Sequence, residues 1–252
     1  MDEIPRRTFC SFAAASAVLA AGCGSTVSTT DRRATSENGV VVTTRRELES
    51  AFDDLSSGDT VYISAENAPY RTTEWLDIDA DDVSVTGPGV RTLVKPEDGA
   101  NVGGFRVGHH RECRNIDIRG VGYHGNPAGQ DASADRLHGI AVRDASDVTI
   151  ADNRISGTHP RRHGDGGSGI SVSRACTGVR IFANRISDYG DRGIQLGGSR
   201  HAVFGNTVMA GLDRPVSCDL WYPDGTNRTA RGVSVFGNLL GDSFEGSLVG
   251  VA

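Results

Sequence analysis

The sequence predicts an all-β fold in which short parallel strands wind into a solenoid. Residues 139–210 repeat one pattern three times, and the repeats begin at Gly139, Gly169 and Gly193. Each repeat holds three short stretches of alternating apolar residues, separated by Gly, Asn, Asp or Ser, which is typical of strands joined by turns. The starting glycines are 30 and 24 residues apart, a spacing typical of stacked repeats that cannot bury their apolar faces alone.

Alternation along the first strand of each repeat predicts which side chains fill the interior. Successive side chains on a strand point to opposite faces, so Ile140 should face one side while Gly139 and Ala141 face the other. Stacked coils would then place Ile140, Ile170 and Ile194 in one column, at about 4.8 Å per coil. We expect this column to be the core of the solenoid.

An asparagine recurs at the corner between the second and third strands of each repeat. Asparagine tolerates left-handed backbone geometry, and its side-chain amide can hydrogen-bond from one coil to the next. We therefore expect a structural ladder made of Asn153, Asn184, Asn206 and Asn238.

The repeat and its asparagine ladder resemble the right-handed parallel β-helix of the pectate-lyase-like superfamily, over roughly residues 44–252. The resemblance implies a right-handed, single-stranded parallel β-helix of about six to seven coils. In that superfamily the substrate groove lies on the outer face of the first-strand sheet. The superfamily's lysine base has no counterpart there, because the only lysine is Lys95. Signature blocks of individual lyase and glycosidase families are also absent.

The N-terminal residues look like a targeting segment that is not part of the fold. Arg6-Arg7-Thr8-Phe9 resembles a twin-arginine signal. The apolar stretch 12–21 is too short to span a bilayer. Residues 20–23, Ala-Ala-Gly-Cys, resemble a lipobox that has Ala where Leu is commoner.

These features predict a signal peptide over 1–22, a flexible tether over 23–40 and a β-helix domain over 41–252. With a lipid on Cys23, the protein would be exported and anchored at the extracellular face of the cell membrane. Soluble secretion and an uncleaved anchor are the alternatives.

The domain should begin with a capping α-helix over about residues 45–56. Thr44 and Glu47 fit a capping box, Leu48 and Phe52 follow at helical spacing, and Gly58 would end the helix. A helix here would cover the open first coil of the solenoid.

The flanking strands follow the same alternation. Residues 61–64 would form the first strand of the chain, and the next coils would use 76–78, 83–85, 92–94, 105–107, 116–118 and 121–123. A later coil would use 218–222, 233–235 and 238–240, and 248–251 would begin another first strand. No capping segment follows, so we expect either more chain or a second subunit of a homo-oligomer to cover that strand edge.

Neither a nucleic-acid partner nor a zinc site is indicated by the charge and the cysteines of the chain. The formal net charge is −6, which gives no indication of nucleic-acid binding. The cysteines that follow the leader, Cys113, Cys176 and Cys218, form no C-x-x-C pair, so a zinc site is not indicated.

The third turn of each coil is long, and long loops on a rigid scaffold usually carry function. These turns cover residues 125–138, 157–168, 188–192 and 210–217. They flank the first-strand sheet, whose predicted outward residues are mostly small: Gly139, Ala141, Gly169, Ser171, Gly193 and Gln195. A flat floor between loop walls suits an extended chain, so we expect a polysaccharide partner.

Polar and aromatic residues are concentrated in these turns. The catalytic candidates are His138, His163, Asp165, Tyr189, Asp191 and Arg192. The candidates for substrate binding are His124, His159, Gln195, Asp219, Trp221 and Tyr222.

Two reaction classes fit these candidates. In β-elimination from a uronic-acid polymer, His163 or Tyr189 would be the base and Arg192 would neutralise the carboxylate. Asp165 and Asp191 would then be ligands for Ca²⁺, the one cofactor that the sequence suggests. The same groups could epimerise a uronate.

In glycoside hydrolysis, the second class, Asp165 and Asp191 would be the two catalytic carboxylates. A non-catalytic adhesin or glycan-binding surface protein is the alternative from another class, because solenoids serve both roles.

Overall fold

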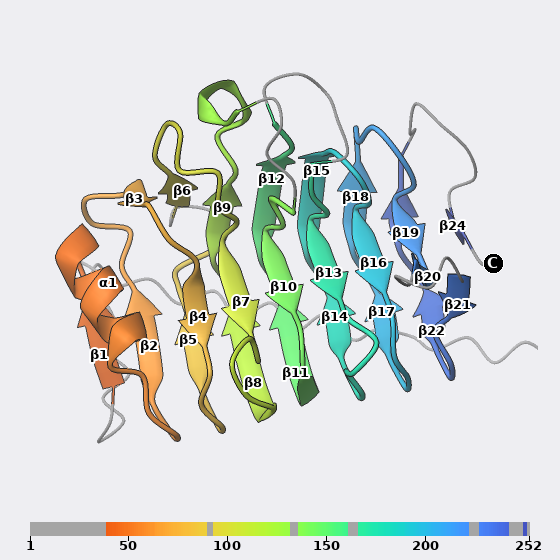
Figure 1. Cartoon of the computed structure of the whole chain (residues 1–252), viewed down its shortest axis with the longest axis horizontal. Coiled ribbons are helices and arrows are strands. Elements are labelled where there is room, and N and C mark those ends of the chain that lie inside the picture. Colours follow the sequence, from red (N-terminus) through yellow and green to blue (C-terminus); the bar gives the residue numbers. More distant parts are fainter. Residues whose placement is uncertain are drawn as a thin grey trace, which may run out of the picture. The chain divides into compact units, whose positions relative to one another are not determined.

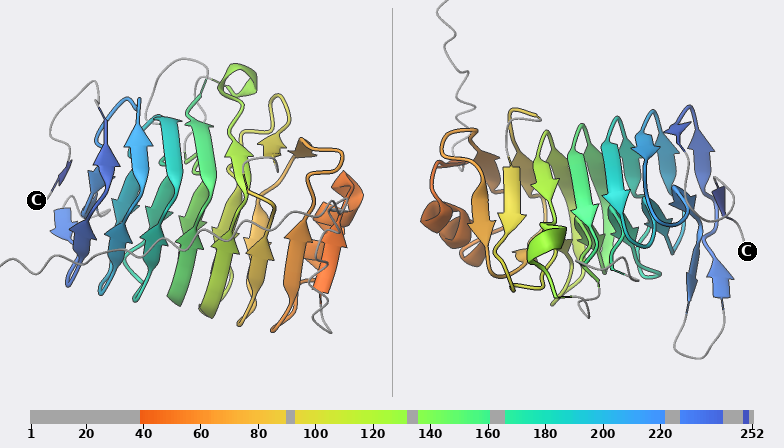
Figure 2. Two further views of the ribbon diagram at one scale, coloured as in Figure 1. Left: turned by 180° about the vertical axis from the view of Figure 1, so that it is seen from behind. Right: turned by 90° about the horizontal axis from the view of Figure 1, so that it is seen from above.

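The computed structural model is a parallel β-helix, and it describes residues 39–89, 93–131, 136–160, 166–221, 227–241 and 249–250. The chain divides into two units, Met1–Ala34 and Thr35–Ala252, and the β-helix is the second. Figures 1 and 2 show its strands stacked coil upon coil, with the single described α-helix at the N-terminal end of the stack.

Three parallel sheets form the walls of the solenoid. The first-strand sheet contains β4 (Leu76–Ile78), β7 (Phe105–Val107), β10 (Ile140–Val142), β13 (Ile170–Val172), β16 (Ile194–Leu196), β19 (Val216–Ser217) and β24 (Val249–Gly250). The second-strand sheet contains β1 (Gly39–Val42), β2 (Thr60–Ile63), β5 (Ser84–Thr86), β8 (Cys113–Arg119), β11 (Ala145–Ala151), β14 (Arg180–Phe182), β17 (Ala202–Phe204) and β22 (Ser234–Phe236). The third-strand sheet contains β3 (Tyr70–Thr72), β6 (Leu93–Pro96), β9 (Gly122–His124), β12 (Arg154–Thr158), β15 (Arg185–Tyr189), β18 (Thr207–Met209) and β23 (Leu239–Leu240).

The interior column predicted from strand alternation is confirmed. Ile140 pairs with Ile170, and Ile170 pairs with Ile194, in parallel register. Phe105 precedes this column and Val216 extends it. All five side chains are buried, so the column is a continuous apolar core.

The glycines that precede these strands do not face outward, and that part of the prediction was wrong. A Cβ placed on Gly139 or Gly169 would collide with the γ-methyl of Ile155 or Ile186, inside the solenoid. The strand alternation starts only at the next residue, because the glycine lies in the bend before the strand. Glycine is needed here because the third-strand side chains fill the space that a methyl group would occupy.

The asparagines form a hydrogen-bonded ladder along the corner between the second and third strands. The backbone N–H and the side-chain amide of Asn153 both donate to Oδ1 of Asn184, at 3.0 and 3.1 Å. The same pair of bonds joins Asn184 to Asn206 and Asn206 to Asn238. The left-handed residue is not the asparagine itself but the residue before it, as at Asp152 (φ 57°).

The helix α1 (Arg45–Asp53) covers the N-terminal end of the solenoid. Thr44 and Glu47 form the predicted capping box, and Leu48 and Phe52 are buried against the first coils. The helix ends three residues earlier than the sequence suggested, with Asp54 at its C-cap.

Strand β1 was not predicted, since Gly39 and Val40 were assigned to the tether. The strand predicted at residues 61–64 corresponds to β2, which is therefore not the first strand of the chain, and it pairs with β1 and β5 in the second-strand sheet. The strand β3 that follows it was missed as well.

The last predicted coil is also shifted. Its first strand is β19, which pairs with β16, whereas the prediction placed it at residues 218–222. Residues after Cys218 instead form a hairpin of β20 (Asp219–Trp221) and β21 (Asn227–Thr229). A short 3-10 helix, η1 (Pro127–Gly129), lies in an earlier third turn.

Cys113, Cys176 and Cys218 are buried in the solenoid. Within the described residues, no helix is both long and apolar enough to cross a membrane.

Candidate functional site

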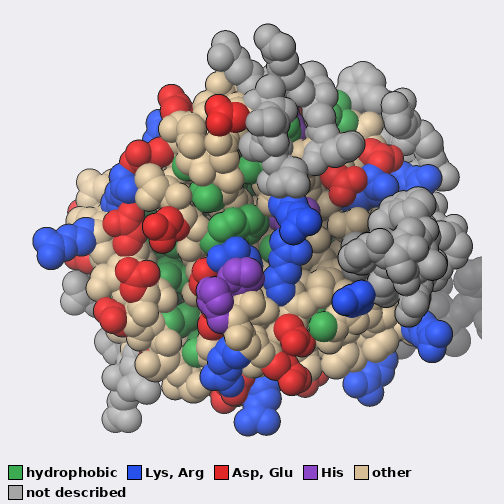
Figure 3. Space-filling model, in the orientation of Figure 1, with side chains coloured by type: hydrophobic (Ala, Val, Ile, Leu, Met, Phe, Trp, Pro, Cys, Tyr) green, Lys and Arg blue, Asp and Glu red, His purple; other side chains and the backbone are tan. Residues whose placement is uncertain are grey.

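A pocket of about 450 Å³ opens on the outer face of the first-strand sheet. It lies over β4, β7 and β10, and its lining residues are Trp75, Asn101, Arg106, His109, Arg136 and Arg143. Figure 3 shows this face of the molecule, where Lys or Arg and His side chains gather beside hydrophobic ones near its middle. Three guanidinium groups therefore line one open pocket next to an indole ring.

Arg106 is held in place by the strand before it and by the indole. Asp77 and Arg106 are direct partners in the register of β4 and β7. Their side chains form a two-point ion pair, with Nε–Oδ1 at 2.6 Å and Nη2–Oδ2 at 2.7 Å. The guanidinium also lies 5.2 Å from the centre of the Trp75 ring. Such pairing fixes a side chain more firmly than a single contact does.

Arg143 follows β10 and brings a charge that the described residues do not balance. Its guanidinium makes no hydrogen bond or ion pair with any residue that the structure describes. Burial lowers the pKa of Arg143, and the neighbouring Arg136 and Arg106 lower this pKa further. An arginine still keeps its proton at neutral pH, so this half-buried cation favours an anionic ligand.

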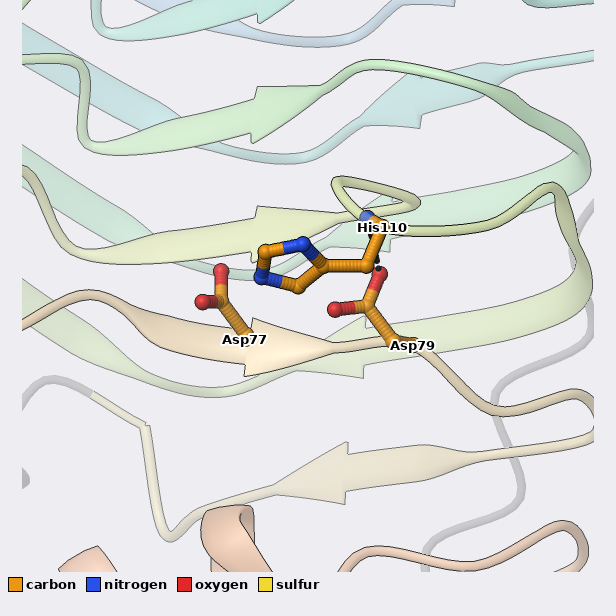
Figure 4. A group of neighbouring side chains, drawn as sticks. All are labelled: Asp77, Asp79 and His110. Carbon is orange, nitrogen blue, oxygen red and sulfur yellow. Dashed lines mark hydrogen bonds between the residues drawn. The ribbon is translucent and has the colours of Figure 1, made fainter.

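The turn after β7 is anchored by one carboxylate. Oδ1 of Asp79 accepts the backbone N–H groups of His109 and His110, at 2.7 and 3.0 Å. Figure 4 shows Asp79 beside Asp77 and His110. The imidazole rings of His109 and His110 lie 4.3 Å apart, centre to centre.

These same side chains are close enough together to be considered for a metal ion. In the described part of the chain, Asp77, Asp79 and His110 are the only group of three with possible ligand atoms within 4.8 Å of one another. However, Asp77 uses both oxygens on Arg106, and Asp79 already accepts two backbone N–H groups. Their geometry is explained by protein contacts, so we assign no metal here.

An acidic hollow borders the basic pocket at its N-terminal side. Trp75 lines both, and the second hollow, of about 390 Å³, also contains Glu49, Asp53 and Glu74. Arg45 also lines this hollow and pairs with Glu49, so Asp53 and Glu74 leave it acidic and unfavourable for a polyanion.

Two of the predicted catalytic residues, Asp191 and Arg192, lie together further along the same face. Nη1 of Arg192 is 2.5 Å from Oδ1 of Asp191, and it also pairs with Asp213, which sequence reasoning missed. Asp191 also accepts a long hydrogen bond of 3.4 Å from the Ser168 hydroxyl. Arg192 is thus occupied by two carboxylates, and Asp213 lies in a turn where a lone Asp gives no sequence signal.

His138 and Tyr189, also predicted to be catalytic, are buried. Nδ1 of His138 accepts the backbone N–H of Ser168 at 2.9 Å, and burial lowers the pKa of His138 to about 3. Burial, and then Asp213, raise the pKa of Tyr189, whose hydroxyl has no hydrogen-bond partner among the described residues. Both residues therefore pack inside the corner of their coil, and neither side chain is open to solvent.

His124 and His159 lie on the side of the third-strand sheet. Nε2 of His159 is 2.9 Å from Oδ1 of Asp188, and Nδ1 of His124 accepts the backbone N–H of Asn126. Burial and then Lys95 lower the pKa of His124. The structure therefore does not bring these two histidines to the basic pocket.

The residues predicted to form the floor of the groove lie in one row at the middle of the first strands, but Ala141 and Ser171 are buried and only Gln195 is partly exposed. Ala141, Ser171 and Gln195 are consecutive partners in the register, and the Ser171 hydroxyl donates to Oε1 of Gln195 at 3.3 Å. Asp219 and Trp221 lie on β20, where the structure describes only the backbone. His163, Asp165, Tyr222 and Cys23 lie outside the described residues.

The residues of the basic pocket were not among the sequence candidates. Those candidates came mostly from the long third turns, whereas Arg106, His109 and Arg143 lie on or directly after the first strands. The sequence feature that could have identified them is an arginine at a similar position in two successive coils, Arg106 and Arg143. This feature can be recognised only after the register of the strands is known.

Two comparisons place the chain among known folds. Residues 103–220 match the family model described as the right handed beta helix region. Among solved structures, the chain is similar to the crystal structure of an alginate lyase from Paenibacillus sp. str. FPU-7, with a TM-score of 0.55 and 13% sequence identity. The match covers 81% of this chain and 66% of that one, so the chain spans just under two thirds of its length. No curated protein matches the chain in sequence.

The predicted right-handed parallel β-helix is thereby confirmed. The likeness, at this level of identity, concerns the fold alone.

Proposed function

We propose that this β-helix binds an acidic polysaccharide along its first-strand sheet and cleaves it by β-elimination. The observation that carries the proposal is Arg143, a half-buried cation without a described partner in a pocket shared with Arg106 and Arg136. Guanidinium groups recognise carboxylates through paired, charge-assisted hydrogen bonds.

The rest of the pocket suits a sugar chain. Trp75 offers an apolar ring that can stack on a sugar, and Asn101 offers both a donor and an acceptor for hydroxyl groups. Further along the same sheet, Gln195 is the partly exposed residue at the middle of its strand, and its amide can bond sugar hydroxyl groups. The alginate lyase of similar fold acts on a polymer of this class, as its name states, which supports the choice of a uronate polymer.

Elimination is favoured over hydrolysis because the described carboxylates on this face are engaged. Asp77 is bound by Arg106, and Asp191 is bound by Arg192. Hydrolysis needs one carboxyl group that donates a proton and another that acts as base or nucleophile. Elimination instead needs a base and a positive charge that neutralises the substrate carboxylate, and the arginines supply this positive charge.

The test uses the full-length protein with polymannuronate, polyguluronate, polygalacturonate and a neutral glucan. We expect unsaturated uronate ends, followed by their ultraviolet absorbance, with at least one acidic polymer and none with the glucan. New reducing ends without unsaturation would identify a hydrolase, and altered C5 configuration without cleavage would identify an epimerase. Binding without any chemistry would favour the glycan-binding alternative.

We further propose that the protein is exported and tethered by a lipid on Cys23. The arginine pair at Arg6 and Arg7 and the sequence before Cys23 support this. Replacing Cys23 by Ala should move the protein from the membrane fraction to the soluble fraction. Unchanged fractionation would contradict lipidation at this residue.

A further inference from the structure

We infer that His109 is the proton-abstracting base of this pocket, an assignment that rests on the proposed β-elimination. His109 lines the pocket together with Arg106, Arg136 and Arg143, on the same face of the first-strand sheet. Among the described residues that line this pocket, His109 is the only histidine, and none is Asp, Glu, Lys or Tyr. A base and the carboxylate-binding groups are therefore brought to one place.

The position of His109 is set by its backbone and leaves its ring accessible. The backbone N–H groups of His109 and His110 donate to Asp79, which holds the turn close to the end of β7. The side chain of His109 itself is exposed at the edge of the pocket. A base must be both fixed and reachable by the substrate, and this turn meets both conditions.

The surrounding charges favour the neutral imidazole, which is the form that can take a proton. Partial burial lowers the pKa of His109, and the positive charges of Arg106 and His110 act in the same direction. Asp77 and Asp79 act in the opposite direction with smaller effect. Asp77 is itself paired with Arg106, and Arg143 lines the same pocket.

Other residues that could act as bases are placed less well in the described part of the chain. Tyr189 is buried and its pKa is raised, which opposes ionisation. Nδ1 of His138 is already bound to Ser168, inside the coil corner. Lys95 lies on β6 in the third-strand sheet, on a different side of the solenoid.

The step balances without a further reactant. The neutral ring of His109 takes the proton from C5 of the uronate, and the electrons of that C–H bond form the C4–C5 double bond. The C4–O glycosidic bond breaks, and the leaving oxygen takes a proton from water. The imidazolium then returns its proton to solvent, which completes the cycle. Arg143 stabilises the negative charge that develops on the carboxylate during this step.

The test compares His109→Gln with the control His110→Gln on an acidic polymer that the full-length protein cleaves. We expect His109→Gln to lower kcat by about a hundredfold or more, the usual contribution of a general base, with polymer affinity changed less than about threefold. His110→Gln should keep kcat within about fivefold. The acidic limb of the kcat/KM profile should disappear in His109→Gln, and added imidazole should partly restore the rate of His109→Ala.

The outcomes separate this assignment from the proposed function. If the unaltered protein cleaves the polymer and His109→Gln cleaves it equally well, the base assignment is wrong and the lyase function stands. The base assignment is also wrong if His110→Gln loses as much activity as His109→Gln. If the unaltered protein gives no unsaturated product with any acidic polymer, both the elimination and its base are overturned.

Discussion

Arg143 is the residue on which the proposed function depends, because its charge is half-buried and unbalanced by any described side chain. Placing a cation in such surroundings costs free energy that a folded protein does not recover from its own contacts. A ligand carboxylate would recover it. Arg106 differs, because Asp77 and Trp75 already compensate its charge.

The substitution Arg143→Gln should therefore weaken binding without weakening the fold. A hydrogen bond to a charged group contributes about 1.5–3 kcal/mol, so we expect about a 10- to 150-fold loss of affinity for a uronate polymer. The free energy of unfolding should stay constant or rise. Calorimetric titration and urea unfolding measure the two effects. Arg154→Gln, an exposed arginine on β12, is the matched control and should change neither.

His138 gives the fold a dependence on pH. Burial lowers its pKa to about 3, whereas an imidazole in the unfolded chain titrates near pH 6.5. As the pH falls, His138 therefore binds a proton in the unfolded chain before it does so in the folded protein. The free energy of unfolding then falls below about pH 6.5, by up to about 1.4 kcal/mol per pH unit. Burial lowers the pKa of His201 as well, so it adds to the same loss.

Urea midpoints measured at pH 8 and pH 5 test this dependence. We expect a lower midpoint at pH 5, and a smaller difference between the two pH values in His138→Asn, whose amide oxygen can still accept the N–H of Ser168. Equal differences in the variant and the unaltered protein would show that His138 does not cause the dependence.

At the scale of elements, the asparagine ladder joins consecutive coils at the corner between two sheets. Each buried amide accepts from the asparagine before it and donates to the one after it, and it also bonds a backbone carbonyl of the preceding coil, as Asn184 does with Ile150. The ladder thus satisfies backbone groups that no strand pairing reaches.

Asn184→Ala should be much more costly than the same change at the end of the ladder. It leaves the backbone N–H of Asn153 buried without its partner, at a cost of about 1–3 kcal/mol, and it removes the bond to the carbonyl of Ile150. Asn238 is the last rung and is partly exposed, so Asn238→Ala should cost less. Denaturant unfolding of both variants measures the difference, and equal costs would contradict a cooperative ladder.

At the scale of the whole molecule, each coil of the solenoid contacts only its neighbours, so its stability depends on how its ends are covered. The helix α1 covers the first coil, with Leu48 fully buried beneath it. Without that cover, the apolar interior and the edges of the first strands would meet solvent.

Leu48→Ala should therefore destabilise the N-terminal coils more than the rest. A large-to-small change at a buried position costs about 2–5 kcal/mol. Hydrogen exchange should accelerate most in β1, β2 and β3, and light scattering should show more self-association. Ala51→Ser, at a partly buried position of the same helix, serves as control. Uniform acceleration across all coils would show instead that the solenoid unfolds as one unit.

The sequence by itself determined the fold, the interior column and the N-terminal helix cap. These features depend on short-range patterns, such as the alternation around Ile140 and the capping box of Thr44 and Glu47, which local chemistry reproduces in every coil. It misled where a strand is too short or too isolated to show alternation, as at β1, β3 and β19, and at the glycines before the first strands, where the alternation has not yet begun.

The tertiary structure decided which polar residues meet. Asp77, Arg106 and Arg143 come from three coils and are separated by about 30 to 40 residues each along the chain, so no local pattern joins them. Their proximity follows from the register of β4, β7 and β10, which is set by the packing of the whole core. Side-chain burial likewise withdrew His138 and Tyr189 from solvent, because a residue's exposure depends on its neighbours in space and not on its neighbours in sequence.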